Sequence, residues 1–222
     1  MKFEGFSPET SAFLWELMFH NERPWFLAHK EEFERVLKLP FDALAQETLA
    51  LLRQRFPERD FHLHISRIYR DARRLYGHGP YKDHLWFTLW DGATRQDSPA
   101  FWFELGAAQY GYGVGFWAMN AEQMERYRRA FLADCGTVER LVRGIAAQER
   151  FQLYGEEYKR PKGDVGAELN AWYNRKNIGL ECSRDFGEAL FSAGLPTVLA
   201  DGFSFLMPYY DFFCRFREGG VR

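Results

Sequence analysis

The first third of the chain has apolar residues at helical spacing. Ser7 and Pro8 have the character of a helix start, with a serine N-cap and a proline at the first helical position. Phe13 and Leu17 then lie one helical turn apart and give this helix an apolar face. Two further helices are predicted, each opening at a proline. Residues 7–57 are therefore predicted to form a helical segment.

The hydrophobic pattern changes at Phe61, where short aromatic-rich segments alternate apolar and polar residues between Gly, Pro and Asp. The predicted strands are His62–Asp71, Trp86–Trp90, Ala100–Leu105 and Gln109–Met119. The strand segment thus covers residues 61–119. Helical spacing returns from Asn120 and extends to residue 217, with one short strand candidate at Ile178–Cys182.

The order of helices, strands and helices is that of an α+β protein and not of a βαβ alternation. We expect a central antiparallel sheet packed by N-terminal and C-terminal helices. With 222 residues, of which 46% are hydrophobic, the chain has enough apolar surface for a substantial core, and we expect residues 1–222 to form a single domain.

Charge and cysteine content narrow the classes of protein further. A net charge of −2 disfavours a general binder of nucleic acid or anionic membranes, because both need a broad basic face. The three cysteines are far apart, which is typical of a reducing compartment and not of a disulfide framework. No signal-like or membrane-spanning run is present, so we expect a cytoplasmic protein with no membrane partner. The sequence indicates no oligomeric state.

Basic charge is concentrated in one segment. Residues 66–84 contain five Arg or Lys and two Asp, a net charge of +3. If residues 66–73 are extended, Arg67, Tyr69, Asp71 and Arg73 share one face of the sheet. Arg70 lies on the other face, where we expect it to pair with an acid from a packed helix. A turn through residues 77–79 then returns the chain beside this strand.

Two hypotheses fit this basic segment. In the first, Arg67, Arg73 and Lys82 bind a small anionic ligand that carries phosphate or carboxylate, while Asp71 orients the guanidinium groups and Tyr81 donates a hydrogen bond. In the second, the charges form a structural salt-bridge network in a non-enzymatic interaction or scaffold module. Single-stranded nucleic acid on the aromatic sheet face is a third possibility, which the near-neutral charge disfavours.

The sequence offers few candidates for catalytic residues, metal ligands or cofactor-binding motifs. If the site is catalytic, Tyr81 and His78 are the candidate proton carriers. His62 and His64 have a spacing that metals use, but no third ligand is evident and we expect no metal. The chain has no nucleophile elbow, P-loop or Cys-x-x-Cys pair, and we expect no cofactor.

Two other segments carry possible functional residues. Gly111-x-Gly113-x-Gly115 lacks the spacing of a dinucleotide fingerprint and is expected in a strand, where it allows an aromatic ring, a second backbone or a ligand to approach. Lys162 lies in a basic loop that would add a cation to the pocket if it folds over the arginine segment. The candidate ligand-binding residues are Arg67, Arg70, Asp71, Arg73, Tyr81, Lys82 and Lys162.

The combined motifs resemble an uncharacterised bacterial family, with relatives inside longer fungal proteins, known as domain of unknown function 2461. Its Arg-x-x-Arg-Asp-x-Arg-Phe segment corresponds to residues 67–74, and the end of its Asp/Asn-Lys-x-Pro-Tyr-Lys segment to residues 80–82. Its Asn-Asn-x-x-x-Trp-Phe motif corresponds to residues 20–26. Arg74 replaces the family's Phe and His78 stands where the family has Lys. The resemblance implies an architecture and the location of a site, and it supplies no reaction.

Overall fold

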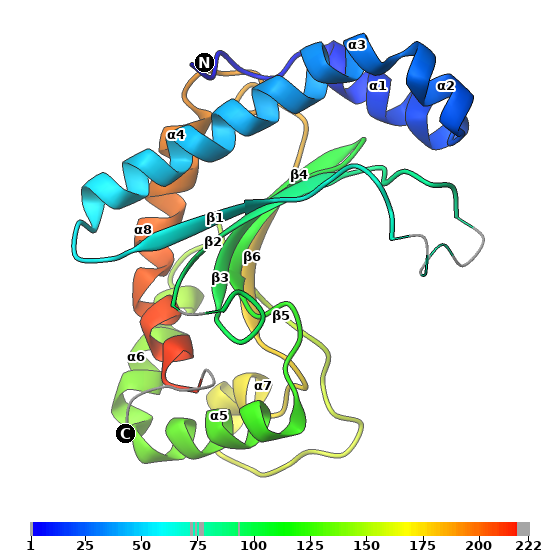
Figure 1. The fold of residues 1–222 in the computed structure, drawn as a ribbon. Helices are drawn as coiled ribbons and strands as arrows, with labels where there is room; N and C mark the ends of the chain where they lie inside the picture. Colours follow the sequence, from blue (N-terminus) through cyan, green and yellow to red (C-terminus); the bar gives the residue numbers. More distant parts are fainter. Residues whose placement is uncertain (1, 72, 74, 76–77, 93, 217–222) are drawn as a thin grey trace. The chain divides into compact units, whose positions relative to one another are not determined.

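The chain in the computed structural model divides into two compact units, and Figure 1 shows the course of the backbone. Unit 1 consists of Met1–Leu89, Trp102–Tyr112 and Ser183–Gly202, and unit 2 of Trp90–Phe101, Gly113–Cys182 and Phe203–Arg222. The structure describes all residues except 1, 72, 74, 76–77, 93 and 217–222.

The N-terminal segment is helical, as predicted. Its elements are α1 (Pro8–Phe19), α2 (Arg23–Ala28), α3 (Lys30–Phe33), the π-helical turn η1 (Glu34–Lys38) and α4 (Leu39–Arg55). The third predicted helix was expected to open at Pro40 as a separate element; α4 does begin at Leu39, but the chain passes into it from η1 without a break. The Leu39 N–H bonds to the Glu34 carbonyl, and this wider turn carries the chain past Pro40, which has no N–H to donate.

The sheet is antiparallel and its strands follow the order β1-β2-β3-β4-β6-β5, so the α+β prediction is confirmed. The strands are β1 (Phe61–Ile65), β2 (Leu85–Asp91), β3 (Ala100–Leu105), β4 (Gln109–Gly115), β5 (Gln152–Tyr154) and β6 (Gly179–Asp185). The strand predicted around Ile178–Cys182 is confirmed as β6. Strand β5, which pairs with β6 in the register Leu153 to Leu180, was not predicted.

The C-terminal helices are α5 (Ala121–Ala133), α6 (Cys135–Ala146), α7 (Ala167–Tyr173) and α8 (Leu195–Cys214). Asn120 caps α5 as predicted, with its side chain accepting a hydrogen bond from the Gln123 N–H at 2.8 Å. Within the described residues, no helix is long and apolar enough to cross a membrane.

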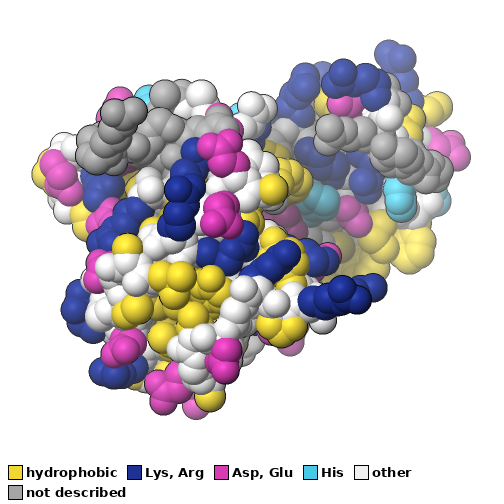
Figure 2. Space-filling model, turned by 90° about the horizontal axis from the view of Figure 1, so that it is seen from below, with side chains coloured by type: hydrophobic (Ala, Val, Ile, Leu, Met, Phe, Trp, Pro, Cys, Tyr) yellow, Lys and Arg dark blue, Asp and Glu magenta, His cyan; other side chains and the backbone are white. Residues whose placement is uncertain are grey.

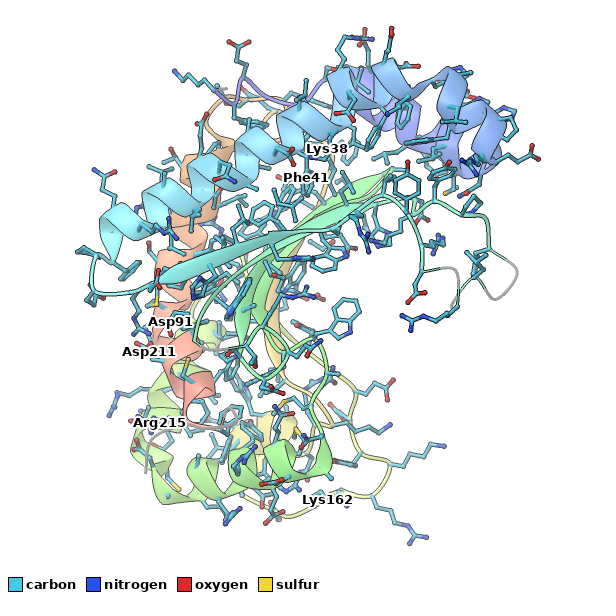
Figure 3. All side chains as sticks on the ribbon, in the orientation of Figure 1. Lys38, Phe41, Asp91, Lys162, Asp211 and Arg215 are labelled. Atoms are coloured by element: carbon cyan, nitrogen blue, oxygen red, sulfur yellow. The ribbon has the colours of Figure 1, made fainter. Side chains whose placement is uncertain are left out.

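Aromatic side chains form the core of each unit. In unit 1 the Phe41 ring of α4 lies 5.9 Å from the rings of Phe87 and Phe103 on β2 and β3 (Figure 3), so α4 is anchored on these strands by aromatic packing. In unit 2 a side chain at Gly113 would collide with the Leu180 carbonyl of β6. The close approach expected at the glycine-rich strand is therefore made by a second backbone.

Candidate functional site

The arginine segment does not continue the sheet, and the predicted strand His62–Asp71 is wrong beyond Ile65. Strand β1 ends at Ile65. At the next residue, the Ser66 hydroxyl accepts a hydrogen bond from the Trp86 N–H at 3.0 Å. In a continuing strand this N–H would bond to a backbone carbonyl of the neighbouring strand. Beyond it, Tyr69 and Tyr81 form an isolated antiparallel bridge, flanked by hydrogen bonds from Arg70 N–H to the Pro80 carbonyl and from Lys82 N–H to the Ile68 carbonyl, each 2.8 Å. The predicted return of residues 80–82 beside the arginine segment is thus confirmed.

Asn21 holds the return segment in place from the turn between α1 and α2. Its amide nitrogen donates to the Tyr81 carbonyl and its oxygen accepts from the Tyr81 N–H, both at 2.9 Å. A side chain at Gly79 would collide with this amide, which accounts for a glycine there. The motif of residues 20–26 and the motif of residues 80–82 therefore form one structural feature.

Tyr81 is a core residue with 2% of its surface exposed. Its ring stacks on Phe26 of α2 with centroids 4.2 Å apart. Burial raises the pKa of its phenol, and the nearby Tyr69 acts in the same direction. The roles expected for the Tyr81 hydroxyl, as a donor to a ligand or a proton carrier, stay predictions, while its packing role is clear.

Arg70 bonds to the return segment and not to a helix, which corrects the predicted pairing. Its Nε donates to the Tyr81 carbonyl at 2.7 Å and its Nη2 lies 3.6 Å from the Asp83 carboxylate. Asp83 also accepts a hydrogen bond from His84 Nδ1 at 2.9 Å. Burial acts to raise the pKa of Asp83, but the bond from His84 and the charges of His84 and Arg70 outweigh it, so the pKa is lowered. A carboxylate that holds the Nδ1 of an imidazole is typical of proton-transfer sites.

Asp71 and Arg73 pair with each other. Arg73 Nε and Nη2 donate to the two carboxylate oxygens at 3.0 and 2.8 Å, and this contact raises the pKa of Arg73. The Arg73 side chain is 88% exposed, so the pair lies in solvent. His78 is also exposed. The predictions that concern Arg74 and Gly77 fall outside the described residues.

Lys82 and Arg67 are two further cations of the hairpin, and they lie in contact. Lys82 Nζ donates to the Arg67 carbonyl at 2.6 Å and lies 5.8 Å from the centroid of the Trp86 ring. The pKa of Lys82 is lowered by burial and then by the charges of Arg70 and Arg67, against a smaller opposing effect of Glu104. Arg67 is exposed, and no carboxylate among the described residues forms an ion pair with its guanidinium group.

Lys162 belongs to unit 2, on the loop between β5 and α7 (Figure 3). Its backbone N–H donates to Asn174 Oδ1 at 2.6 Å. The expectation that this loop adds a cation to the arginine pocket stays a prediction.

Sequence reasoning gave no role to Asn21, Asp83 and His84. Asn21 stood in a family motif, which was the signal that could have marked it as more than a helix break. Asp83 and His84 directly follow the Pro-Tyr-Lys motif, but a charged residue beside a motif gives no sign of its partner. Histidines 62 and 64 lie on β1, and within the described part of the chain no group of three His, Cys, Asp or Glu is arranged to hold a metal ion.

The comparison with protein families places these motifs in context. A family model described as a conserved hypothetical protein (DUF2461) matches residues 9–212. The chain belongs to this family. The match includes every described residue of the arginine hairpin, and the family's description names no activity. No curated protein matches the chain.

Proposed function

We propose that unit 1 binds a small anionic ligand, bearing phosphate or carboxylate, at Arg67, Arg70 and Lys82. The observation that supports this most directly is the environment of Lys82: burial lowers the pKa of its ammonium group, and the charges of Arg70 and Arg67 lower it further, against a smaller opposing effect of Glu104. A partly buried ammonium group beside like charges is costly to protonate, and a bound anion relieves that cost. The exposed fork of Arg67 is suited to bidentate binding of an oxyanion.

The other predicted residues have supporting roles in this proposal. Arg70 is fixed by the Tyr81 carbonyl and Asp83, so its remaining donor capacity is oriented before a ligand arrives. Tyr81 shapes the hairpin from the core. Asp71 and Arg73 saturate each other, and we assign them no direct contact with the ligand.

A second candidate function is the interaction or scaffold module with a structural charge network. The bonds of Arg70 and Arg73 favour it, since both guanidinium groups are engaged by the protein itself. It does not account for Arg67, which has no carboxylate partner among the described residues. The two hypotheses therefore differ most at Arg67 and Lys82.

The test is calorimetric titration with inorganic phosphate at constant ionic strength. Under the ligand hypothesis, Arg67→Ala and Lys82→Met each weaken binding about tenfold or more, since one charge-assisted hydrogen bond contributes about 1.5–3 kcal/mol. Arg73→Ala is the matched control, because it removes an equal charge from the same hairpin and is expected to leave the affinity unchanged.

Thermal unfolding of the same variants tests the scaffold hypothesis. If Arg67→Ala lowers the melting temperature while wild-type protein shows no phosphate binding at this hairpin, the ligand proposal is wrong. If phosphate raises the melting temperature of the wild type and of Arg73→Ala but not of Arg67→Ala, the scaffold hypothesis is wrong.

A further inference from the structure

Unit 2 contains a largely buried arginine with one donor that no described acceptor satisfies. Arg128 lies on α5 with its side chain only 13% exposed. Its Nη2 donates to Glu125 at 3.1 Å, one turn earlier in the helix. Its Nη1 is buried and has no hydrogen-bond partner among the described residues. A buried donor without an acceptor is costly, and such groups in native proteins call for an explanation.

Unit 2 contains a second arginine, Arg175, whose three guanidinium nitrogens all have acceptors. Arg175 donates from Nε to the Ala171 carbonyl at 2.8 Å, from Nη1 to the Gly155 carbonyl and from Nη2 to Glu157. Both arginines act on the buried phenol of Tyr127. Burial raises the pKa of this phenol well above its ordinary value, and the charges of Arg175 and Arg128 act to lower it. Arg128 thus differs from Arg175 because its Nη1 donor has no acceptor among the described residues. Both arginines contribute positive charge around Tyr127.

Tyr158 connects Arg128 to Lys162. The Arg128 guanidinium carbon lies 6.0 Å from the centroid of the Tyr158 ring, and Lys162 Nζ lies 4.7 Å from the same centroid. Both cations are therefore attracted to one ring at distances typical of cation–π contacts. Both positive groups therefore contact one ring, which neutralises neither of them.

The loop that carries Lys162 is held in place by Asn174. The Asn174 oxygen accepts from the N–H groups of Lys162 and Gly163, and its nitrogen donates to the Gly163 carbonyl at 3.0 Å. The Asn174 carbonyl accepts the Tyr158 N–H at 2.9 Å. One residue thereby fixes both the loop and the tyrosine, so the two cations are positioned before any ligand binds.

We propose that Arg128, Tyr158 and Lys162 form an oxyanion site within unit 2, which takes a phosphate or carboxylate group between Arg128 Nη1 and Lys162 Nζ. The bound group supplies the acceptor that Arg128 lacks and offsets the charge of Lys162. Tyr158 forms a wall of the site through its ring. All of its residues belong to unit 2, whereas those of the arginine hairpin belong to unit 1.

The acids near this site do not replace such a ligand. Glu125 and Glu157 are more than half exposed, and each already bonds to the outer nitrogen of one arginine. Figure 2 views the molecule from below, the side on which Figure 1 draws α5 and α7, and Lys and Arg side chains there lie beside a hydrophobic surface.

The experiment is residue-specific lysine acetylation with mass-spectrometric readout, with and without inorganic phosphate at constant ionic strength. We expect phosphate to protect Lys162 in the wild type. The phosphate concentration needed for half protection should rise about tenfold in Arg128→Met, which loses one charge-assisted hydrogen bond. Lys159→Ala, from the same loop, is the matched control and should leave the protection of Lys162 unchanged.

Calorimetry separates this site from the arginine hairpin and does not depend on how well Arg128→Met folds. If both sites exist, the wild type binds two phosphates, and Lys162→Ala and Arg67→Ala each bind one. If the hairpin does not bind, the wild type binds one phosphate, Arg67→Ala still binds one, and Lys162→Ala binds none. Unprotected Lys162 in the wild type, or an unchanged stoichiometry in Lys162→Ala, would overturn the proposal for unit 2.

Discussion

Two basic segments of this protein, the arginine hairpin and the loop of Lys162, are each held by an asparagine side chain that bonds to the backbone, but their arginines differ in their hydrogen-bond partners. In unit 1 the Asn21 amide bonds to both backbone groups of Tyr81, next to Lys82. In unit 2 the Asn174 amide bonds to the backbone of Lys162 and Gly163. Each asparagine lies just after the end of a helix, and its hydrogen bonds fix the backbone at or beside a lysine, Lys82 in unit 1 and Lys162 in unit 2. An amide suits this purpose because it offers a donor and an acceptor from one group.

The arginines around the two lysines differ in what they bind. Arg70 uses its Nε on a backbone carbonyl of the hairpin and therefore helps to hold the fold. Arg128 leaves Nη1 buried and without a partner among the described residues. The difference shows that residue type alone does not distinguish an arginine that stabilises the fold from one that can bind a ligand. What distinguishes them is the number of N–H donors that remain without an acceptor after folding, and this number is a property of the folded protein.

Removal of the two asparagines should have the largest effect on stability and should be unequal. Asn21→Ala breaks two partly buried hydrogen bonds and leaves the Tyr81 backbone unsatisfied, so we expect a loss of about 2–3 kcal/mol in the free energy of unfolding. Asn174→Ala breaks bonds in an exposed loop, where water replaces them, and should cost about 1 kcal/mol or less. Urea denaturation followed by fluorescence measures both.

The variant with the smaller expected loss of stability, Asn174→Ala, should have the larger effect on phosphate binding at Lys162. Asn174→Ala frees the loop of Lys162 and should weaken phosphate protection of that lysine, although the fold is nearly as stable as before. Equal losses of stability in the two variants would contradict the view that the first asparagine serves the fold and the second serves the loop.

The hairpin arginines offer a second, smaller contrast. Arg70→Ala removes a charge-assisted bond to a largely buried carbonyl and leaves Asp83 without one of its cations, so we expect about 1–2 kcal/mol of destabilisation. Arg73→Ala breaks an ion pair that lies in solvent, and we expect a smaller loss of stability than in Arg70→Ala. Thermal unfolding at low and high salt distinguishes them, because only the exposed pair is strongly screened. A larger loss in Arg73→Ala than in Arg70→Ala would refute this assignment.

The fold was largely predictable because its signals are local. Ser7 and Pro8 mark the start of α1, and Asn120 marks the start of α5, through chemistry that acts within one turn. Strand β5 escaped prediction because a three-residue strand has too few positions for an alternating pattern. The end of β1 at Ile65 escaped it for another reason: the hydroxyl of Ser66 replaces a ladder bond, and a serine in the sequence gives no indication of this.

The candidate site was predictable in its residues and not in their partners. The basic charge of residues 66–84 marked the hairpin, and the family motif marked its return. The partner of Arg70 depends on where the chain after Tyr81 returns, which side-chain alternation cannot specify. Likewise nothing in the sequence joins Arg128 to Tyr158, since these residues meet only through the packing of unit 2.

The smallest expected effect concerns the titration of Lys82. The pKa of Lys82 in the folded protein is lowered from its ordinary value of 10.5, so the unfolded chain binds its proton more tightly. Stability should therefore rise with pH between the folded and the ordinary pKa of this lysine, and protonated Lys82 opposes folding below that interval. Phosphate bound beside Arg67 favours the charged amine and should shift the pKa back upward. NMR titration of the lysine side chains, with and without phosphate, follows Lys82 directly. In Arg67→Ala the starting pKa should be higher and the phosphate-induced shift smaller, and a shift that persists in full would place the anion elsewhere.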